Sequence, residues 1–293
     1  MPTRITAAVC GALTLTALAV PAAHADDDGT RGAYRAPGLG RAAEAEAPYD
    51  LDVTFSAVKV AKAVKVGPTG HHSTTVTYKL THGADVDITA EDFLTGPYLY
   101  RGAYGSPDNT LFGNKPATCT ATSATTAKCT GKIDVYPAQG DLLNSEAGTW
   151  KGAALAIAYN GQDPDGDDFD ITKVGYADQG ALATTKVQRA SKLTVNASPE
   201  PVRKGRTLTI TGKLSRANWE TRKYAGYATQ PVKLQFRKAG TSTYTDVRNV
   251  TTTSKGELKT TVKASADGHY RFTFAGTGTT PAVNAKGDFV DVR

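Results

Sequence analysis

Apolar and polar residues alternate with a period of two through the last third of the chain. In the run 232–237, Val232, Leu234 and Phe236 alternate with charged and amide side chains, and the run 269–274 repeats this pattern. Successive side chains of a β-strand point to opposite faces, so these runs predict strands with one buried and one solvated face. Seven strands are predicted in this way: Leu193–Val195, Thr207–Lys213, Val232–Arg237, Asp246–Thr251, Glu257–Lys263, His269–Phe274 and Asp288–Val292. Residues 191–293 are therefore expected to form two antiparallel sheets packed face to face.

The length of this segment and the position of Tyr270 favour an immunoglobulin-like topology. A tyrosine near the start of the sixth strand, two residues before an inward residue, is typical of the tyrosine corner of that fold. Four stretches also resemble bacterial immunoglobulin-like modules of secreted actinobacterial proteins: Gly205–Leu214 (GRTLTITGKL), Gln230–Arg237 (QPVKLQFR), Ser254–Val262 (SKGELKTTV) and Tyr270–Gly276 (YRFTFAG). The resemblance covers the last third of the chain, and it implies fold and export more than a particular function.

Residues 49–190 are long enough to form a second domain with its own core. Short alternating runs recur there, for example at Val76, Tyr78 and Leu80, and no long window shows helical periodicity. The predicted fold class is all-β, with two tandem antiparallel β-sandwich domains, of which the C-terminal one is immunoglobulin-like. The junction at 189–192 contains no Gly or Pro, which indicates two docked or stiffly coupled domains.

The N-terminal segment has the features of an export signal. Arg4 precedes the apolar run 7–20, and Ala23-His24-Ala25 forms a small-x-small cleavage site, so residues 1–25 are predicted to be a signal peptide. The apolar run is too short for a stable membrane span. Residues 26–48 contain few large apolar side chains and are expected to form a disordered leader or a removable pro-segment. We expect a secreted, extracellular protein.

Two cysteines remain after signal cleavage, Cys119 and Cys129. An even number of cysteines in an exported chain predicts a disulfide bond between them. The spacing does not fit a redox Cys-x-x-Cys motif, and no further Cys or His pair accompanies it to complete a zinc site.

The two halves of the chain carry opposite net charge. Residues 26–191 contain 15 Lys and Arg against 21 Asp and Glu, a net charge of −6. Residues 192–293 contain 18 against 7, a net charge of +11. The basic domain is expected to attract polyanions, and the acidic domain cations or the basic domain itself.

The stretch 215–231 is a candidate binding loop, since it is longer than a plain connection between strands requires. Cations alternate in it with aromatic rings, a combination that suits anionic polymers and sugars. The candidate binding residues are Arg216, Trp219, Arg222, Lys223, Tyr224 and Tyr227. In the alternative interpretation, Trp219 and the tyrosines fold back and cap the open end of the sandwich.

An acidic stretch in the N-terminal half is a candidate metal site. Asp163, Asp165, Asp167 and Asp170 resemble part of a calcium-binding loop, because calcium takes several oxygen ligands from one loop. The spacing departs from the EF-hand pattern. The alternative is a solvated hairpin loop, and calcium is the one cofactor that the sequence suggests.

Sequence motifs of catalysis are absent from the chain: it contains no Gly-x-Ser-x-Gly, no His-Glu-x-x-His and no phosphate-binding glycine loop. We expect a non-enzymatic binding protein of the cell envelope or extracellular space. The expected partners are an anionic cell-wall polymer, a polysaccharide or another protein, without specific nucleic-acid binding. Two alternatives are a hydrolase of polysaccharides that uses carboxylates of the N-terminal domain, and a purely structural spacer.

Overall fold

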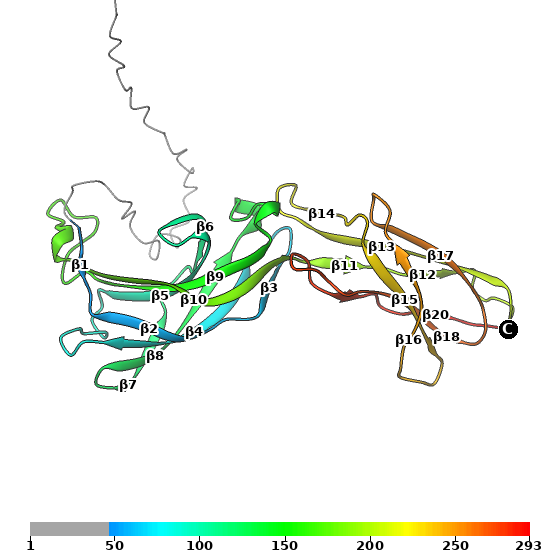
Figure 1. Ribbon diagram of the computed structural model, residues 1–293, viewed down its shortest axis with the longest axis horizontal. Coiled ribbons are helices and arrows are strands. Elements are labelled where there is room, and N and C mark those ends of the chain that lie inside the picture. Colours follow the sequence, from blue (N-terminus) through cyan, green and yellow to red (C-terminus); the bar gives the residue numbers. More distant parts are fainter. Residues whose placement is uncertain (1–46) are drawn as a thin grey trace, which may run out of the picture.

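The computed structural model describes residues 47–293, so the predicted signal peptide and nearly all of the predicted leader lie outside the described residues. The described chain forms two β-sandwiches joined end to end (Figure 1). Its only helical elements are three short 3₁₀ turns, η1 (Pro137–Gln139), η2 (Asn144–Glu146) and η3 (Ile171–Lys173). No helix in the described part is long and apolar enough to cross a membrane. The all-β prediction is confirmed.

Ten strands build the N-terminal sandwich. One sheet has the order β1-β10-β9-β5-β6, with β3 also paired to β10, and the other has the order β2-β4-β8-β7. The strands are β1 (Tyr49–Asp50), β2 (Val53–Lys59), β3 (Ala63–Val66), β4 (His72–His82), β5 (Phe93–Ala103), β6 (Ser106–Phe112), β7 (Thr118–Ser123), β8 (Thr126–Val135), β9 (Gly148–Ala158) and β10 (Gly175–Arg189).

This connectivity is also immunoglobulin-like, which the sequence predicted only for the C-terminal domain. The β10-β9-β5-β6 sheet corresponds to the larger sheet of variable-type domains, and β2-β4-β8-β7 to the smaller one. Trp150 lies at the start of β9, fully buried, and its indole Nε1 donates to the carbonyl oxygen of Glu146 at 2.8 Å. The side chain thus makes the backward hydrogen bond that a tyrosine makes in the tyrosine corner.

The predicted disulfide between Cys119 and Cys129 is present. The two residues lie directly opposite one another on β7 and β8, with their Cα atoms 4.0 Å apart. The bond therefore joins neighbouring strands of one sheet, whereas the disulfide of antibody domains joins the two sheets.

The C-terminal sandwich follows the predicted strands closely. One sheet contains β11, β12, β13, β14 and β17, and the other has the order β16-β15-β18-β19, with β20 also paired to β18. The strands are β11 (Ser191–Leu193), β12 (Asn196–Ser198), β13 (Thr207–Asn218), β14 (Lys223–Gly226), β15 (Pro231–Lys238), β16 (Thr245–Thr251), β17 (Glu257–Lys263), β18 (Gly268–Phe274), β19 (Val283–Asn284) and β20 (Asp288–Val290). The domain has the predicted immunoglobulin-like arrangement, in which β16 is paired to β15. These are the fourth and third of the seven predicted strands.

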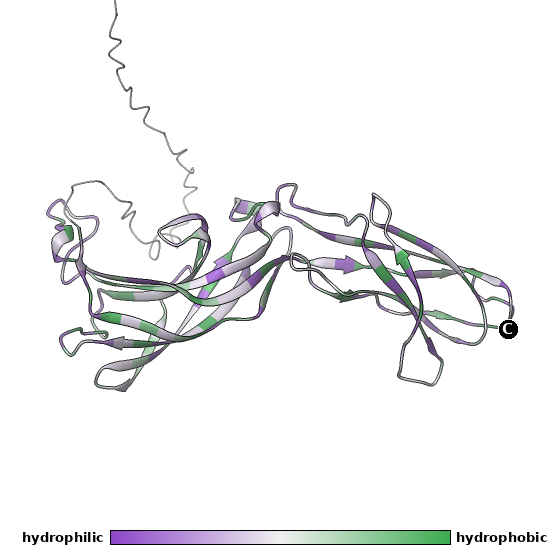
Figure 2. Cartoon of the chain, in the orientation of Figure 1, coloured by the Kyte–Doolittle hydropathy of each residue, from purple (hydrophilic) through white to green (hydrophobic). Residues whose placement is uncertain are grey.

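Inward and outward positions of the C-terminal strands are those that the alternation predicted. Leu208, Ile210, Leu234 and Phe272 are buried in one core between the two sheets. Figure 2 shows short hydrophobic segments alternating with hydrophilic ones along the strands. The tyrosine corner prediction is wrong in one respect. Tyr270 is buried against Phe236, with ring centroids 4.8 Å apart, but within residues 47–293 its hydroxyl makes no hydrogen bond.

Candidate binding surfaces

Trp219 is not an exposed recognition residue, because it lies in the interface between the two domains. The β13 strand continues to Asn218 and forms a hairpin with β14, which places Trp219 against the N-terminal domain. Its side chain is 1% exposed and shares a hydrophobic cluster with Val66 and Trp150. The indole Nε1 also donates to the carbonyl oxygen of Val66 at 3.3 Å. Trp219 therefore closes the end of the N-terminal core, whereas the alternative interpretation placed it over its own sandwich.

The other five residues of the predicted loop do not form one open surface. The guanidinium of Arg216 stacks on the Tyr227 ring at 3.8 Å, and the Lys192 ammonium lies 4.0 Å from the centre of the Tyr224 ring. Arg222 and Lys223 are exposed at the turn of the hairpin. The predicted loop 215–231 therefore does not present one open aromatic surface, because most of its aromatic surface packs inside the protein. A binding role of its exposed cations stays a prediction.

Backbone hydrogen bonds hold the two domains together at the junction, as its sequence indicated. Ala190 lies between β10 and β11; its N–H donates to Val66 at 2.8 Å, and its carbonyl accepts from Ala217 at 2.7 Å. Arg189 is buried and donates from Nε to the carbonyl of Ala217 at 2.6 Å. Burial, together with the nearby charge of Arg216, lowers the pKa of Arg189 to about 10, so it remains charged at neutral pH.

Asn144, at the start of η2, adds side-chain contacts across the same interface. Its amide Nδ2 donates to Asn218 Oδ1 at 2.8 Å, and its Oδ1 accepts from the backbone N–H of Trp219 at 3.1 Å. The backbone N–H of Asn144 also donates to the Glu220 carboxylate at 3.1 Å. The turn is thus held by hydrogen bonds at Trp219 itself and at the residues before and after it in the sequence.

The four aspartates of the predicted calcium loop do not converge. Asp170 caps η3 by accepting from the backbone N–H and the hydroxyl of Thr172, and it pairs with Lys173 at 3.2 Å. Asp163 accepts from the backbone N–H of Asp165 at 3.0 Å. Between residues 47 and 293, no group of three or more His, Cys, Asp or Glu side chains is placed to hold a metal ion. This geometry does not support the calcium prediction.

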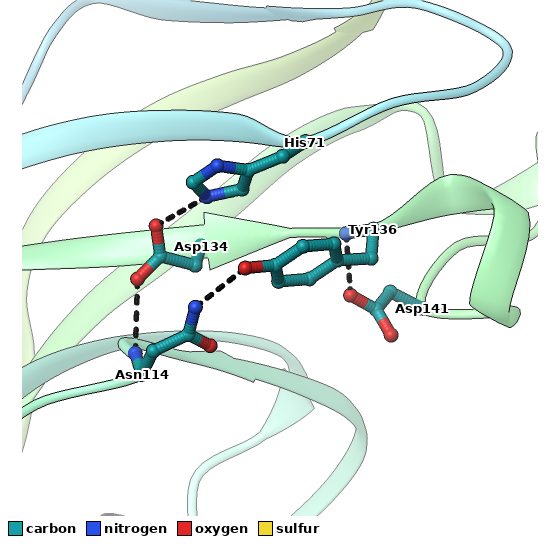
Figure 3. Close-up of polar contacts among 5 residues, drawn as sticks. All are labelled: His71, Asn114, Asp134, Tyr136 and Asp141. Atoms are coloured by element: carbon teal, nitrogen blue, oxygen red, sulfur yellow. Dashed lines mark hydrogen bonds and ion pairs between the residues drawn. The ribbon is translucent and has the colours of Figure 1, made fainter. Parts of the chain in front are cut away.

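His71 belongs to a polar cluster that fastens β4 to the end of β8 (Figure 3). Its Nε2 lies 2.6 Å from a carboxylate oxygen of Asp134, and its ring stacks on Tyr136 with centroids 4.6 Å apart. The other carboxylate oxygen of Asp134 accepts from the backbone N–H of Asn114 at 2.9 Å. Burial alone would raise the pKa of Asp134, but these hydrogen bonds outweigh it and hold that pKa below its ordinary value.

The Asp134→Asn variant should lose stability in a pH-dependent way. A carboxylate whose folded pKa lies below its unfolded value of about 3.9 stabilises the fold fully above that value, and the stabilisation is lost as the pH falls through the folded pKa. At pH 7 the variant should be about 1–3 kcal/mol less stable, the range for hydrogen bonds to charged groups. Thermal unfolding at pH 7, 5 and 3 measures the difference. A gap between wild type and variant that stays constant from pH 7 to pH 3 would contradict this role of the ionised carboxylate.

Two arginines on the C-terminal domain share one tyrosine ring. The guanidinium carbons of Arg271 and Arg237 lie 3.8 and 5.3 Å from the centre of the Tyr244 ring. Both arginines project from the outer face of the β15-β18 pair, where Arg237 stands opposite His269. Gly287 permits this packing, because a Cβ there would overlap the Tyr244 hydroxyl.

Neither arginine of this pair is neutralised within the described chain. Arg271 donates to the side-chain oxygen of Gln235 at 2.9 Å and Arg237 to the carbonyl of Thr241 at 2.6 Å, both uncharged acceptors. The ion pairs of the described residues involve other side chains. Beside the pair, Phe289 is 45% exposed and its ring lies 5.1 Å from that of His269. We call Arg237, Arg271, Tyr244, His269 and Phe289 the arginine–tyrosine patch.

Two surface depressions lie on the N-terminal domain, and both are open to solvent. One is bounded by residues 82–89 and by residues 121–124 of the β7–β8 hairpin. The other lies beside β10 and includes Asp178. Neither has the form of the deep acidic cleft that the hydrolase alternative calls for.

Comparisons with known proteins assign no family to the chain. No model of a protein family matches the chain, and no curated protein matches it. Among solved structures, the Yersinia pseudotuberculosis adhesin InvE is 12% identical, with 82% of this chain and 58% of that chain covered and a TM-score of 0.25. The Escherichia coli adhesin FdeC is 16% identical, with coverages of 83% and 65% and a TM-score of 0.28. The D00-D0 domain of intimin is 12% identical, with coverages of 81% and 99% and a TM-score of 0.26.

The chain spans about three fifths of the length of the two adhesins. The immunoglobulin-like assignment of both domains rests on their strand connectivity.

Proposed function

We propose that the protein is a non-enzymatic binding protein of the cell envelope or extracellular space, whose basic C-terminal domain contacts an anionic cell-wall polymer or polysaccharide. The observation that carries the proposal is the pair Arg237 and Arg271, held on one tyrosine ring without a carboxylate partner in the described chain. Export of the chain by the signal peptide of residues 1–25, and its relation to the modules of secreted actinobacterial proteins, are parts of the same proposal.

The chemistry of the arginine–tyrosine patch suits phosphate, sulfate and carboxylate groups. A guanidinium is a planar fork of donors that can bind such groups through two parallel hydrogen bonds. Two like charges held close together on one face are unfavourable, and a bound anion relieves that repulsion. The exposed ring of Phe289 and the half-buried ring of His269 lie beside the two cations, where a sugar ring of the same polymer could pack.

Retention on insoluble cell wall, with chitin and cellulose as uncharged comparators, tests the proposal. The wild-type protein should be retained on cell wall and released as salt is raised, because exposed charges are screened over about 8 Å at physiological ionic strength. The double variant Arg237→Gln/Arg271→Gln should bind about tenfold more weakly or worse, since two charge-assisted hydrogen-bond donors are lost.

The matched control is Lys259→Gln/Lys263→Gln. Both lysines are exposed on β17, in the opposite sheet of the same domain, and this variant removes the same two charges. It should be retained like the wild type. If both double variants lost the same retention on cell wall, net charge alone would drive binding. If the wild-type protein were retained on cellulose as strongly as on cell wall, anion recognition would be excluded.

A further inference from the structure

The outer face of the larger N-terminal sheet is aromatic where a solvated face is normally polar. Outward residues Leu155 and Ile157 of β9 are buried in a cluster of their own, separate from the core between the sheets. Tyr98, Tyr100 and Phe112 pack with them: Tyr98 and Phe112 stack with centroids 4.9 Å apart, and the Tyr104 ring lies 5.6 Å from that of Tyr100. The alternation of inward apolar and outward polar residues therefore fails in this part of the sheet.

Asp178 lies on this face, opposite Leu155 in the register of β10 and β9. The Tyr98 hydroxyl donates to its carboxylate oxygens at 2.9 and 3.0 Å, and the Tyr176 hydroxyl donates to one of them at 3.2 Å. The Tyr104 hydroxyl bonds to the same carboxylate. No Lys or Arg of the described chain forms an ion pair with Asp178.

The protonation states at this site follow from its surroundings. Burial raises the pKa of Asp178, while the three hydroxyl bonds act in the opposite direction. Burial, reinforced by the charge of Asp178, raises the pKa of Tyr98, Tyr104 and Tyr176 above the ordinary value. The three hydroxyls therefore stay protonated, and the oxygen of Tyr104, which is 42% exposed, remains accessible as an acceptor from the solvent side.

Asp178 also borders one of the two open depressions. The walls of this depression are formed by residues 176–179 of β10 and, at the β1–β2 corner, by Asp50, Leu51, Val53 and Thr54. These walls contain two carboxylates and no Lys or Arg. The carboxylate of Asp178 is partly desolvated by the surrounding tyrosines, but the residue still has exposed surface, and Tyr104 beside it is 42% exposed. The acceptor groups can therefore be reached from solvent.

We propose that this tyrosine–aspartate site binds an arginine side chain of a protein partner. A carboxylate and tyrosine oxygens are acceptors, so they select a cation with N–H donors. A guanidinium can pair with the carboxylate through two donors and stack on an exposed ring such as Tyr104, which a compact ammonium does less well. The chain itself shows this stacking, since Arg271 and Arg216 lie on Tyr244 and Tyr227 at 3.8 Å.

Other ligand classes fit the site less well. An anionic group would meet the charge of Asp178 without a compensating cation. A neutral sugar is usually held by more than one open ring face, but Tyr98 and Tyr100 are 6% and 1% exposed, and the single ring of Tyr104 offers no charge complementarity to a sugar. The net charge of −6 on residues 26–191 also favours a basic partner. This proposal concerns the N-terminal domain and does not depend on the arginine–tyrosine patch of the C-terminal one.

Titration of the ¹⁵N-labelled protein with blocked Gly-Arg-Gly, Gly-Lys-Gly and Gly-Gly-Gly peptides tests the assignment. The arginine peptide should give saturable shifts of amide signals around 176–180, with a Kd on the order of 1 mM, as suits a single side chain. The lysine peptide should bind several-fold more weakly, and the glycine peptide should cause no saturable shift. Equal affinity for the arginine and lysine peptides would overturn the choice of guanidinium, and no saturable shift with either would overturn the site.

Two variants locate the binding within the domain. Asp178→Asn should weaken arginine binding about tenfold or more, because the charged acceptor is lost. Asp165→Asn removes the same charge from the exposed loop outside the site and should bind like wild type. If Asp178→Asn lowers the stability of the domain, Tyr104→Phe serves in its place, because it removes one exposed hydroxyl and should weaken binding by a smaller factor. Unchanged affinity in Asp178→Asn and in Tyr104→Phe would overturn the proposal.

Discussion

Trp219→Ala should lower the free energy of unfolding by about 3–5 kcal/mol, the usual cost of removing a large buried aromatic side chain. The cavity would open between the domains, because the indole packs with Val66 and Trp150 of the N-terminal domain. The lost hydrogen bond to the Val66 carbonyl would add to this cost. Chemical denaturation, with circular dichroism as the readout, measures the change.

The Arg222→Ala variant is the control for this prediction. Arg222 is exposed three residues further along the same hairpin, so its truncation should change stability by no more than about 0.5 kcal/mol. Retention on cell wall should be unaffected in both variants wherever they remain folded. Weak binding by a folded Trp219→Ala protein would restore a direct role of the tryptophan in recognition.

Loss of the Cys119–Cys129 disulfide should destabilise the N-terminal domain by about 3 kcal/mol, because the bond closes a short loop and restricts the unfolded chain. The Cys119→Ser/Cys129→Ser variant should therefore unfold at a clearly lower temperature than the oxidised wild type. Thermal unfolding of the variant and of the wild type with and without reductant gives the comparison.

The response to reductant is the control for this prediction. Reductant should lower the melting temperature of the wild type towards that of the double serine variant and should leave the variant unchanged. A melting temperature of the wild type that does not respond to reductant, with both thiols shown to be alkylated, would contradict the assigned stabilisation.

The sequence alone predicted the features that depend on local patterns. Period-two alternation identified the strands of the C-terminal domain, because one face of each is buried and the other solvated. The cysteine count identified the disulfide. The immunoglobulin-like connectivity of the N-terminal domain was not predicted, since β9 is buried on both faces and Leu155 and Ile157 break the alternation.

The sites depended on contacts between distant parts of the chain, which local patterns do not show. Trp219 and Val66 are 153 positions apart, so the cations and rings around the tryptophan looked like an open loop. Arg237 and Arg271 were correctly predicted to point outward, but only the fold brings both to Tyr244. Aspartates are common both in calcium-binding loops and in turns, where the carboxylate accepts from a nearby backbone N–H group. The sequence pattern at 163–170 does not distinguish the two, and in the structure Asp163 and Asp170 bond to their own backbone in this way.

The junction between the domains has a consequence for proteolysis. A protease must draw several residues of its substrate into an extended, unpaired conformation, so exposed loops are cut first. At Ala190 both the N–H and the carbonyl are bonded to residues of different domains, and strands begin and end on either side. Cleavage there would require the two domains to separate and expose the tryptophan between them. In an environment rich in secreted proteases, the two domains would therefore persist or be degraded together, and neither would be released alone.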